Sequence, residues 1–151
     1  MDLQEELKAL KERIAELEEQ VEQEKEFPQY GDDYWFLLSG GTIYDNFYTN
    51  SYVDNRRLEI GNVFKTKEQA EFAVEKLKVE AELRKFSRPF ENGGFNYYIS
   101  GDLEEGRVDV MSRAYLPTQG AIYFESAEKA QQAIELVGED RIKKYIFGVE
   151  D

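Results

Sequence analysis

The sequence predicts an α+β protein in which an N-terminal coiled-coil helix precedes a duplicated βββα body. Two observations lead to this fold class. Residues 1–26 follow a heptad pattern, and the rest of the chain contains a weak self-match at an offset of 60 residues. We expect a coiled-coil oligomerisation segment over residues 1–26 and a duplicated domain over residues 27–151. The duplicated domain would form an antiparallel sheet of about six strands with helices on one face.

The composition narrows the classes of function before any motif is considered. The chain has 151 residues, a net charge of −13, no cysteine and no histidine. The missing residues exclude disulfides, thiolate nucleophiles, Cys- or His-ligated metals and catalysis by Ser–His or Cys–His pairs. The negative charge argues against direct binding of nucleic acid or of an anionic membrane. We expect no enzymatic activity and no cofactor. A cytoplasmic location is expected, because the sequence shows no signal peptide and no run of about 18 apolar residues.

Residues 1–26 contain no aromatic residue, glycine or proline, and their apolar residues are alternately three and four positions apart. This spacing is typical of the heptad seam of a coiled coil. The residues expected to mediate oligomerisation are Leu3, Leu7, Leu10, Ile14, Leu17 and Val21. β-Branched residues at two of the three a positions, with leucine at every d position, favour a parallel dimer.

The flanking charges also favour the parallel arrangement. In a parallel pair Glu6 faces Lys11 of the partner subunit and Arg13 faces Glu18 of the partner subunit, whereas an antiparallel pair brings like charges together. Two alternatives stay open: a trimer, or a single amphipathic helix that lies on its own body. Because helices this short are marginally stable alone, the body must assist association.

The self-match relates the two halves of the body. The segments 60–75 and 121–135 share the pattern Phe-x-(Ser/Thr)-x-Glu-x-Ala-x-x-Ala-(Val/Ile)-Glu, whose matching residues are 60 positions apart. Upstream, residues 36–40 align with residues 97–101 at an offset of 61. The expected repeats are 34–86 and 95–147. A duplication of this kind predicts a pseudo-twofold axis through the body.

Each repeat is expected to contain a hairpin, a short third strand and a capped helix. Glycine turns separate the strands of each hairpin, and Thr66 and Ser126 are the expected N-caps of the two helices. The expected strands are Tyr34–Ser39, Thr42–Thr49 and Asn62–Phe64 in repeat one, and Phe95–Ser100, Arg107–Arg113 and Ala121–Phe124 in repeat two. A short amphipathic helix is expected over Asp140–Phe147.

The first of these helices, Lys67–Phe86, is apolar on two sides. Its second apolar stripe consists of Phe72, Val79, Leu83 and Phe86. A helix that is apolar on two sides needs a second cover. Three covers are considered: the other protomer, the base of the coiled-coil helix, and the segment Pro89–Phe95.

Three stretches of the body resemble a known family. Residues 27–35, 57–78 and 122–145 are similar to small accessory proteins encoded by phages and prophages of Gram-positive bacteria. The resemblance implies a setting in the host cytoplasm, where such proteins often disable or divert a host system. It implies no activity and no functional residues.

Tyrosine and arginine are concentrated in the segment Tyr44–Arg57 and again in the second half of the body. Aromatic faces combined with guanidinium groups suit a stacked base, a nucleotide phosphate or a protein interface. The candidate binding residues are Tyr44, Tyr48, Tyr52, Arg56, Arg57, Arg107, Arg113 and Tyr115. The alternative is that they cover a half-exposed sheet and its rim. No metal site is expected, because the acidic residues at 32, 33, 45 and 54 lack the spacing of a calcium loop.

These observations give one leading hypothesis and two alternatives. The leading hypothesis is a non-enzymatic phage accessory protein, a homodimer that binds and inhibits or diverts a host defence or nucleic-acid-processing protein. The first alternative is a small-molecule sponge that holds a nucleotide-like ligand between the repeats or at the dimer interface. The second alternative is a structural virion or assembly component.

Overall fold

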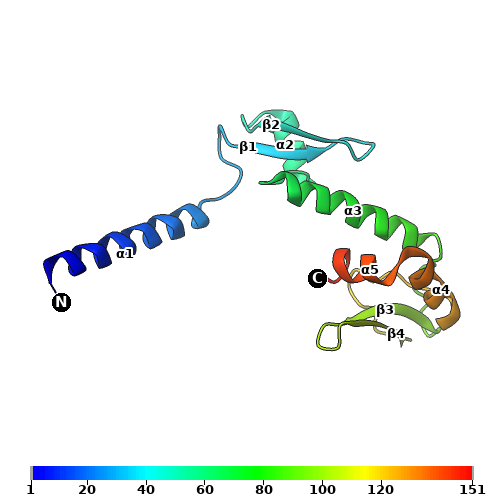
Figure 1. Cartoon of the computed structure of the whole chain (residues 1–151). Helices are drawn as coiled ribbons and strands as arrows, with labels where there is room; N and C mark the ends of the chain where they lie inside the picture. The colour runs from blue at the N-terminus through cyan, green and yellow to red at the C-terminus, as the bar shows by residue number, and fades with distance from the viewer. Residues whose placement is uncertain (1, 151) are drawn as a thin grey trace.

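The computed structural model describes residues 2–150, which form an α+β arrangement (Figure 1). The elements are, in chain order, α1 (Leu3–Glu24), β1 (Asp33–Leu37), β2 (Ile43–Phe47), α2 (Tyr52–Glu59), α3 (Lys67–Arg84), β3 (Asn96–Asp102), β4 (Arg107–Arg113), α4 (Ala127–Val137) and α5 (Glu139–Tyr145). The strands form two antiparallel pairs, β1 with β2 and β3 with β4. We call β1, β2 and α2 the N-terminal lobe, and β3, β4, α4 and α5 the C-terminal lobe.

Helix α1 extends away from both lobes (Figure 1). It begins at a capping box in which the Asp2 side chain accepts a hydrogen bond from the Glu5 amide, and the Glu5 side chain accepts one from the Asp2 amide. No residue of the helix is buried, and its six apolar side chains are between 43% and 82% exposed. The alternative in which this helix lies on its own body is therefore wrong.

The β1–β2 hairpin confirms the first expected hairpin, and its pleat determines which side chains are buried. Tyr34 and Phe36 are buried on one face of β1. Trp35 lies on the opposite face, where the Lys67 ammonium of α3 is 5.7 Å from the centre of its ring. The two faces of the hairpin therefore pack on different helices, one on α3 and the other, as shown below, on α2.

The β3–β4 hairpin confirms the second expected hairpin, and the larger buried cluster lies beside it. The second half of α3 packs against α4 and α5, and α4 also contacts β3 and β4 (Figure 1). The cluster consists of Val79, Leu83, Phe124, Ala130, Ala133, Ile134, Val137 and Ile142. Because α3 also contacts β1 and β2, this helix connects the two lobes.

The second apolar stripe of α3 is covered by the C-terminal lobe. Val79 and Leu83 are buried in the cluster with α4 and α5, and Phe86 packs against that cluster. Phe72 lies beside Tyr145 of α5, with 5.0 Å between the ring centroids. None of the three covers considered from the sequence is the one observed. The second apolar stripe indicated that another segment must cover this face of α3. It did not indicate which distant segment that would be.

The expected six-stranded sheet is wrong, because the third strand of each repeat is reduced to isolated bridges, one in repeat one and two in repeat two. Phe64 bridges Trp35, and Phe124 bridges Tyr97. The bridged residues Trp35 and Tyr97 are 62 positions apart, so the offset of 61 in the hairpin alignment is one residue short. A shift of one residue would place each side chain on the opposite face of its strand. The duplication itself stays a prediction.

The third strands are short because a glycine with positive φ precedes each of them and a helix N-cap follows within a few residues. Gly61 (φ 73°) precedes the first extended run, and the N-cap Thr66 follows it. Gly120 (φ 75°) and the N-cap Ser126 enclose the second run in the same way. A positive φ ends an extended segment, and an N-cap begins a helix. Each hairpin therefore keeps its own two-stranded sheet.

Helix α2 lies in a segment where the sequence predicted no helix. Ser51 caps it by accepting a hydrogen bond from the Asp54 amide, and the Asp54 side chain accepts one from the Ser51 amide in return. The Ser-x-x-Asp spacing of this capping box is visible in the sequence. However, the helix has 8 mostly polar residues, so no apolar period marks it.

Asn96 is a fully buried polar residue that holds three segments of the C-terminal lobe together. Its side-chain oxygen accepts hydrogen bonds from the Arg88 guanidinium at 2.9 Å and from the Glu91 amide at 2.7 Å. Its side-chain nitrogen donates to the carbonyls of Glu91, Gly94 and Arg113 at distances from 2.8 to 3.2 Å. The loop before β3 and the end of β4 are therefore both fixed to the start of β3.

Replacing Asn96 with alanine removes all of these hydrogen bonds from a fully buried position. We expect Asn96→Ala to lower the free energy of unfolding by about 3 kcal/mol, measured by chemical denaturation followed by circular dichroism. The control Gln132→Ala changes an exposed residue of α4 and should shift the free energy by less than about 0.5 kcal/mol. Equal stability of the two variants would contradict the role given to Asn96.

Candidate functional site

The structure divides the candidate binding residues between the two lobes. Tyr44, Tyr48, Tyr52, Arg56 and Arg57 belong to the N-terminal lobe, and Arg107, Arg113 and Tyr115 belong to the C-terminal lobe. The β1–β2 and β3–β4 hairpins lie at opposite ends of α3 (Figure 1). The two groups are therefore not brought together into one site within the chain.

Asp54 is the buried centre of a hydrogen-bond network between α2 and the β1–β2 hairpin. Its Oδ1 accepts a hydrogen bond from the Tyr34 hydroxyl, and its Oδ2 accepts one from the Thr49 amide at 2.8 Å. Arg57 Nη1 donates to the Tyr34 hydroxyl at 2.8 Å and lies 3.9 Å from Oδ1 of Asp54. The network therefore holds α2 against the hairpin.

This environment changes the acidity of both buried groups. Burial on its own raises the pKa of the Asp54 carboxyl. The hydrogen bonds from Tyr34, Thr49 and Ser51 outweigh burial, so the pKa of Asp54 lies well below its usual value of 3.8. Burial, followed by the hydrogen bond to Asp54, raises the pKa of the Tyr34 hydroxyl above 10.0. At neutral pH the network therefore contains a carboxylate and a neutral phenol.

Two of the candidate residues in the N-terminal lobe make structural contacts. The Arg57 guanidinium lies 3.6 Å from the centre of the Phe36 ring, in addition to its hydrogen bond with the Tyr34 hydroxyl. Tyr48 is buried, and its hydroxyl donates to Asn55 Oδ1 at 2.6 Å. These two side chains support the lobe and leave little of their surface for a ligand.

The other candidate residues of this lobe are accessible. Tyr44 is 49% exposed and Tyr52 is 76% exposed. The Arg56 guanidinium lies 5.6 Å from the centre of the Tyr52 ring, one helical turn along α2. Tyr52 and Arg56 therefore form an exposed aromatic and cationic pair of the kind found at protein interfaces.

The candidate residues of the C-terminal lobe do not converge. Arg107 lies in the β3–β4 hairpin between two carboxylates, 3.9 Å from Asp102 and 3.3 Å from Asp109. Arg113 is exposed at the end of β4, and Tyr115 is 70% exposed in the following loop. We see no shared pocket among these three residues in the part of the chain that the structure describes.

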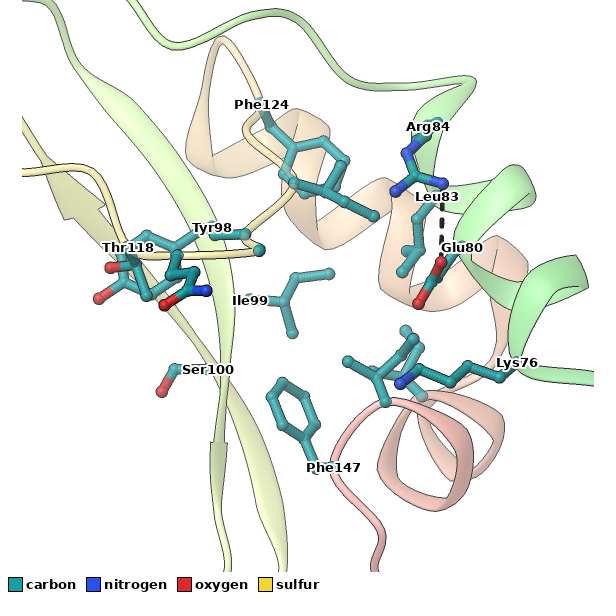
Figure 2. A pocket seen from close by; sticks show the side chains of 16 residues that line it. Lys76, Glu80, Leu83, Arg84, Tyr98, Ile99, Ser100, Thr118, Phe124 and Phe147 are labelled. Carbon is teal, nitrogen blue, oxygen red and sulfur yellow. Dashed lines mark ion pairs between the residues drawn. The ribbon is translucent and has the colours of Figure 1, made fainter. Parts of the chain in front are cut away.

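A cavity of about 340 Å³ lies in the C-terminal lobe, between α3, β3, the loop before α4 and the turn after α5 (Figure 2). The apolar part of its lining includes the partly exposed Ile99 and Phe147, with the buried Leu83 and Phe124 behind them. Figure 2 shows the Ile99 and Phe147 side chains pointing toward its centre. The sequence analysis did not identify this cavity.

The rim of the cavity is polar. Lys76, Glu80 and Arg84 follow one another at four-residue intervals on α3, and Glu80 lies 3.7 Å from Arg84. Ser100 and Thr118 belong to the lining on the β3 side, where the Ser100 side chain points away from Ile99 (Figure 2). An apolar interior with a few polar groups at the mouth is typical of sites that bind small molecules.

Specific contacts shape the walls of the cavity. The Tyr123 hydroxyl accepts a hydrogen bond from the Thr118 amide at 2.6 Å and donates one to the Thr118 carbonyl at 3.1 Å, which fixes the loop before α4. Gly101 lets Phe147 lie close to β3, because a Cβ atom at this position would be 2.6 Å from the Phe147 ring. Glycine inside a strand often marks such a close approach. It is the one sequence signal that could have indicated this site.

A more open groove lies at the junction of the lobes, between β2, α3 and α5. Glu68, Glu71 and Glu75 line it from α3, and Ile43, Phe72 and Val74 form its apolar part. The groove is where the sequence predicted a site between the repeats. None of the candidate tyrosines and arginines lines it.

Residues 2–150 contain no arrangement that suggests a metal centre or a membrane span. No group of three or more acidic side chains there is placed to hold a metal ion. Both carboxylate oxygens of Asp54 already accept hydrogen bonds, from the Tyr34 hydroxyl and the Thr49 amide. Over the same residues, no helix is both long and apolar enough to cross a bilayer.

Comparison with known proteins gives no relative for this chain. No protein-family model, no curated protein and no solved structure matches it. The resemblance to phage accessory proteins stays an expectation from the sequence. Functional proposals therefore depend on the geometry, burial and charge described above.

Asp54→Asn tests the buried network through its pH dependence. The pKa of Asp54 is lower in the folded than in the unfolded protein, so its contribution to stability is complete above about pH 4 and is lost as the pH falls further. We expect the variant to lose about 3 kcal/mol of unfolding free energy at neutral pH. The difference from the wild type should shrink steadily below about pH 4, in urea denaturation at a series of pH values.

Asp45→Asn is the matched control, because it removes the same charge from an exposed position of β2. It should change the free energy of unfolding by less than about 0.5 kcal/mol at every pH. An effect of Asp54→Asn that is independent of pH, or no larger than that of the control, would show that the network does not stabilise the lobe.

Proposed function

We propose that the protein is a non-enzymatic homodimer that binds another protein. In this proposal α1 pairs two copies, and the lobes supply the surface that recognises the partner. The setting suggested by the sequence resemblance is that of a phage accessory protein which inhibits or diverts a host component. The observation that carries the proposal is the apolar stripe of α1, which the chain leaves exposed to water.

The stripe of α1 fits a second copy of the same helix. A 22-residue helix with no buried residue gains none of the tertiary packing that supplies most helical stability in proteins. Ile14, Leu17 and Val21 line a shallow hollow on its surface, and holes between a and d side chains receive the knobs of a paired helix. Removing these side chains from water contributes about 25 cal/mol per Å² of apolar surface.

The charges beside the stripe support a parallel pair. Glu6 would meet Lys11 of the partner subunit, and Arg13 would meet Glu18 of the partner subunit. Arg13 already lies 3.2 Å from Glu16 in the single helix, so dimerisation exchanges one ion pair for another. Exposed ion pairs contribute about 0.5 kcal/mol each. These charges therefore select the orientation of the helices more than they strengthen the dimer.

The junction groove is the surface that we assign to the partner. Glu68, Glu71 and Glu75 place three carboxylates beside an apolar floor that contains Phe72, with Lys144 as the cation of the groove. Lysine and arginine side chains combine an apolar stem with a charged end, so they match this combination. The net charge of −13 per chain would also speed the encounter with a basic protein.

The alternative of a nucleotide-like ligand between the repeats has less support. Its candidate tyrosines and arginines lie in separate lobes, and Tyr48 and Arg57 are engaged within the N-terminal lobe. A nucleotide site at a dimer interface stays a hypothesis, as does a role in virion assembly. We therefore favour a protein partner.

Ile14→Glu tests the role of α1. The substitution places a carboxylate in the seam, so we expect the native mass to fall from twice 17.7 kDa to 17.7 kDa at micromolar concentration, measured by light scattering. The adjacent substitution Ala15→Glu adds the same charge on the outer face of the helix, and this variant should stay dimeric. A wild-type protein with the mass of one chain would contradict the proposal.

The orientation of the helices can be tested separately, because the chain contains no cysteine. Oxidation of a Leu7→Cys variant should join two copies in a parallel pair, since the two a positions then lie side by side. An antiparallel pair would keep these two residues far apart. A dimer that resists this crosslink would contradict the parallel arrangement while leaving dimerisation itself supported.

The partner proposal predicts strong dependence on salt. Binding to a basic host protein should weaken at least tenfold between about 0.05 and 0.5 M salt, measured by calorimetry or surface plasmon resonance. A double variant, Glu71→Gln with Glu75→Gln, should weaken binding at low salt. The control, Glu104→Gln with Glu105→Gln, removes the same charge from the β3–β4 turn and should have a smaller effect. Equal effects of the two double variants would exclude the junction groove.

A further inference from the structure

The cavity of the C-terminal lobe is separate from both α1 and the junction groove, and the proposed function does not use it. We propose that it binds a small organic anion with an apolar body, such as a medium-chain carboxylate. The proposal goes beyond dimerisation and partner binding, and it can be right or wrong independently of them. It stands on the size of the cavity, the chemistry of its inner wall and the charges at its mouth.

The interior of the cavity favours an apolar occupant. Ile99, Ile122, Ile146 and Phe147 are partly exposed and present hydrocarbon surface to it from three separate segments of the chain, with the buried Leu83 and Phe124 behind them. A water molecule needs two to four polar partners to occupy a site well, and these side chains offer none. An apolar group of suitable size would replace water there with a favourable free energy of transfer.

The size and shape of the cavity favour a small molecule over a protein surface. Its volume of about 340 Å³ lies at the lower end of the range of about 300 to 1,000 Å³ that is usual for ligand pockets. Walls from α3, β3, the loop before α4 and the turn after α5 surround it on several sides (Figure 2). The hydrogen bonds between Tyr123 and Thr118 hold one wall in place without a ligand.

The rim of the cavity favours a negatively charged head group. Lys76 and Arg84 supply two cations and Glu80 supplies one carboxylate, which pairs with Arg84 at 3.7 Å. The mouth therefore carries a net positive charge, although the whole chain has a net charge of −13.

The test compares three probes, octanoate, 1-octanol and acetate, which distinguish the contribution of the apolar body to binding from that of the anionic head group. We expect octanoate to bind the full-length protein more tightly than 1-octanol, and acetate not to bind, in titrations followed by two-dimensional NMR. The shifted amide signals should be confined to the second half of α3, to β3, to the loop before α4 and to the turn after α5. Absence of saturable binding by octanoate, or shifts spread over the whole chain, would overturn the proposal.

Lys76→Met tests the head-group contact, because methionine keeps an apolar stem and removes the charge. We expect octanoate affinity to fall about fivefold, which is the loss typical of one exposed ionic contact. The affinity for 1-octanol should be unchanged. Lys78→Met is the matched control, since Lys78 pairs with Glu75 on the same helix and does not line the cavity. Equal losses in both variants, or none in Lys76→Met, would refute the anionic specificity.

Ile99→Trp tests the location of the site by filling the cavity from β3. Octanoate binding should be lost in this variant while its circular dichroism spectrum and native mass match the wild type. If the variant does not fold, the NMR map of the wild-type protein still decides where the probe binds. Octanoate bound with unchanged affinity by a folded Ile99→Trp variant would show that the cavity is not the site.

Discussion

The apolar stripe of α1 is the constraint on which the rest of the account depends. The chain builds a 22-residue helix, caps its start at Asp2, and then buries none of its residues. Helices of this length gain most of their stability from packing an apolar face, not from intrinsic propensity. A helix with an exposed apolar stripe is therefore incomplete as a single chain. In the proposed dimer, pairing with a second copy would supply the missing contact and bring two sets of lobes together.

The lobes themselves depend on one shared helix and on two buried polar centres. Helix α3 contacts the β1–β2 hairpin and the α4–α5 pair, so it carries the connection between them. In the N-terminal lobe the Asp54 carboxylate accepts a hydrogen bond from Tyr34. In the C-terminal lobe the Asn96 side chain forms hydrogen bonds with the segments around it. Tyr34 and Asn96 are 62 positions apart, like the bridged residues Trp35 and Tyr97. The two hairpins therefore use the same strand position to bury a polar group, although the chemistry of the groups differs.

The features that were predictable from the sequence are those that short segments determine. The two hairpins, the helical arm and the caps Thr66 and Ser126 follow from glycine turns, heptad spacing and N-cap chemistry. What the sequence did not show depends on contacts between distant segments. The bond between Tyr34 and Asp54 spans 20 residues, so Arg57 looked like a free ligand group when it is part of that network. The cavity combines four segments, and only Gly101 gave a local signal for it.

Backbone amide hydrogen exchange at a series of protein concentrations tests the central claim most directly. If α1 is stabilised by pairing, protection of its amides should rise with protein concentration, while protection in the lobes should stay constant. The account predicts this contrast between the arm and the lobes. Amides of α1 that exchange rapidly at every concentration, or that are protected equally at all concentrations, would contradict it.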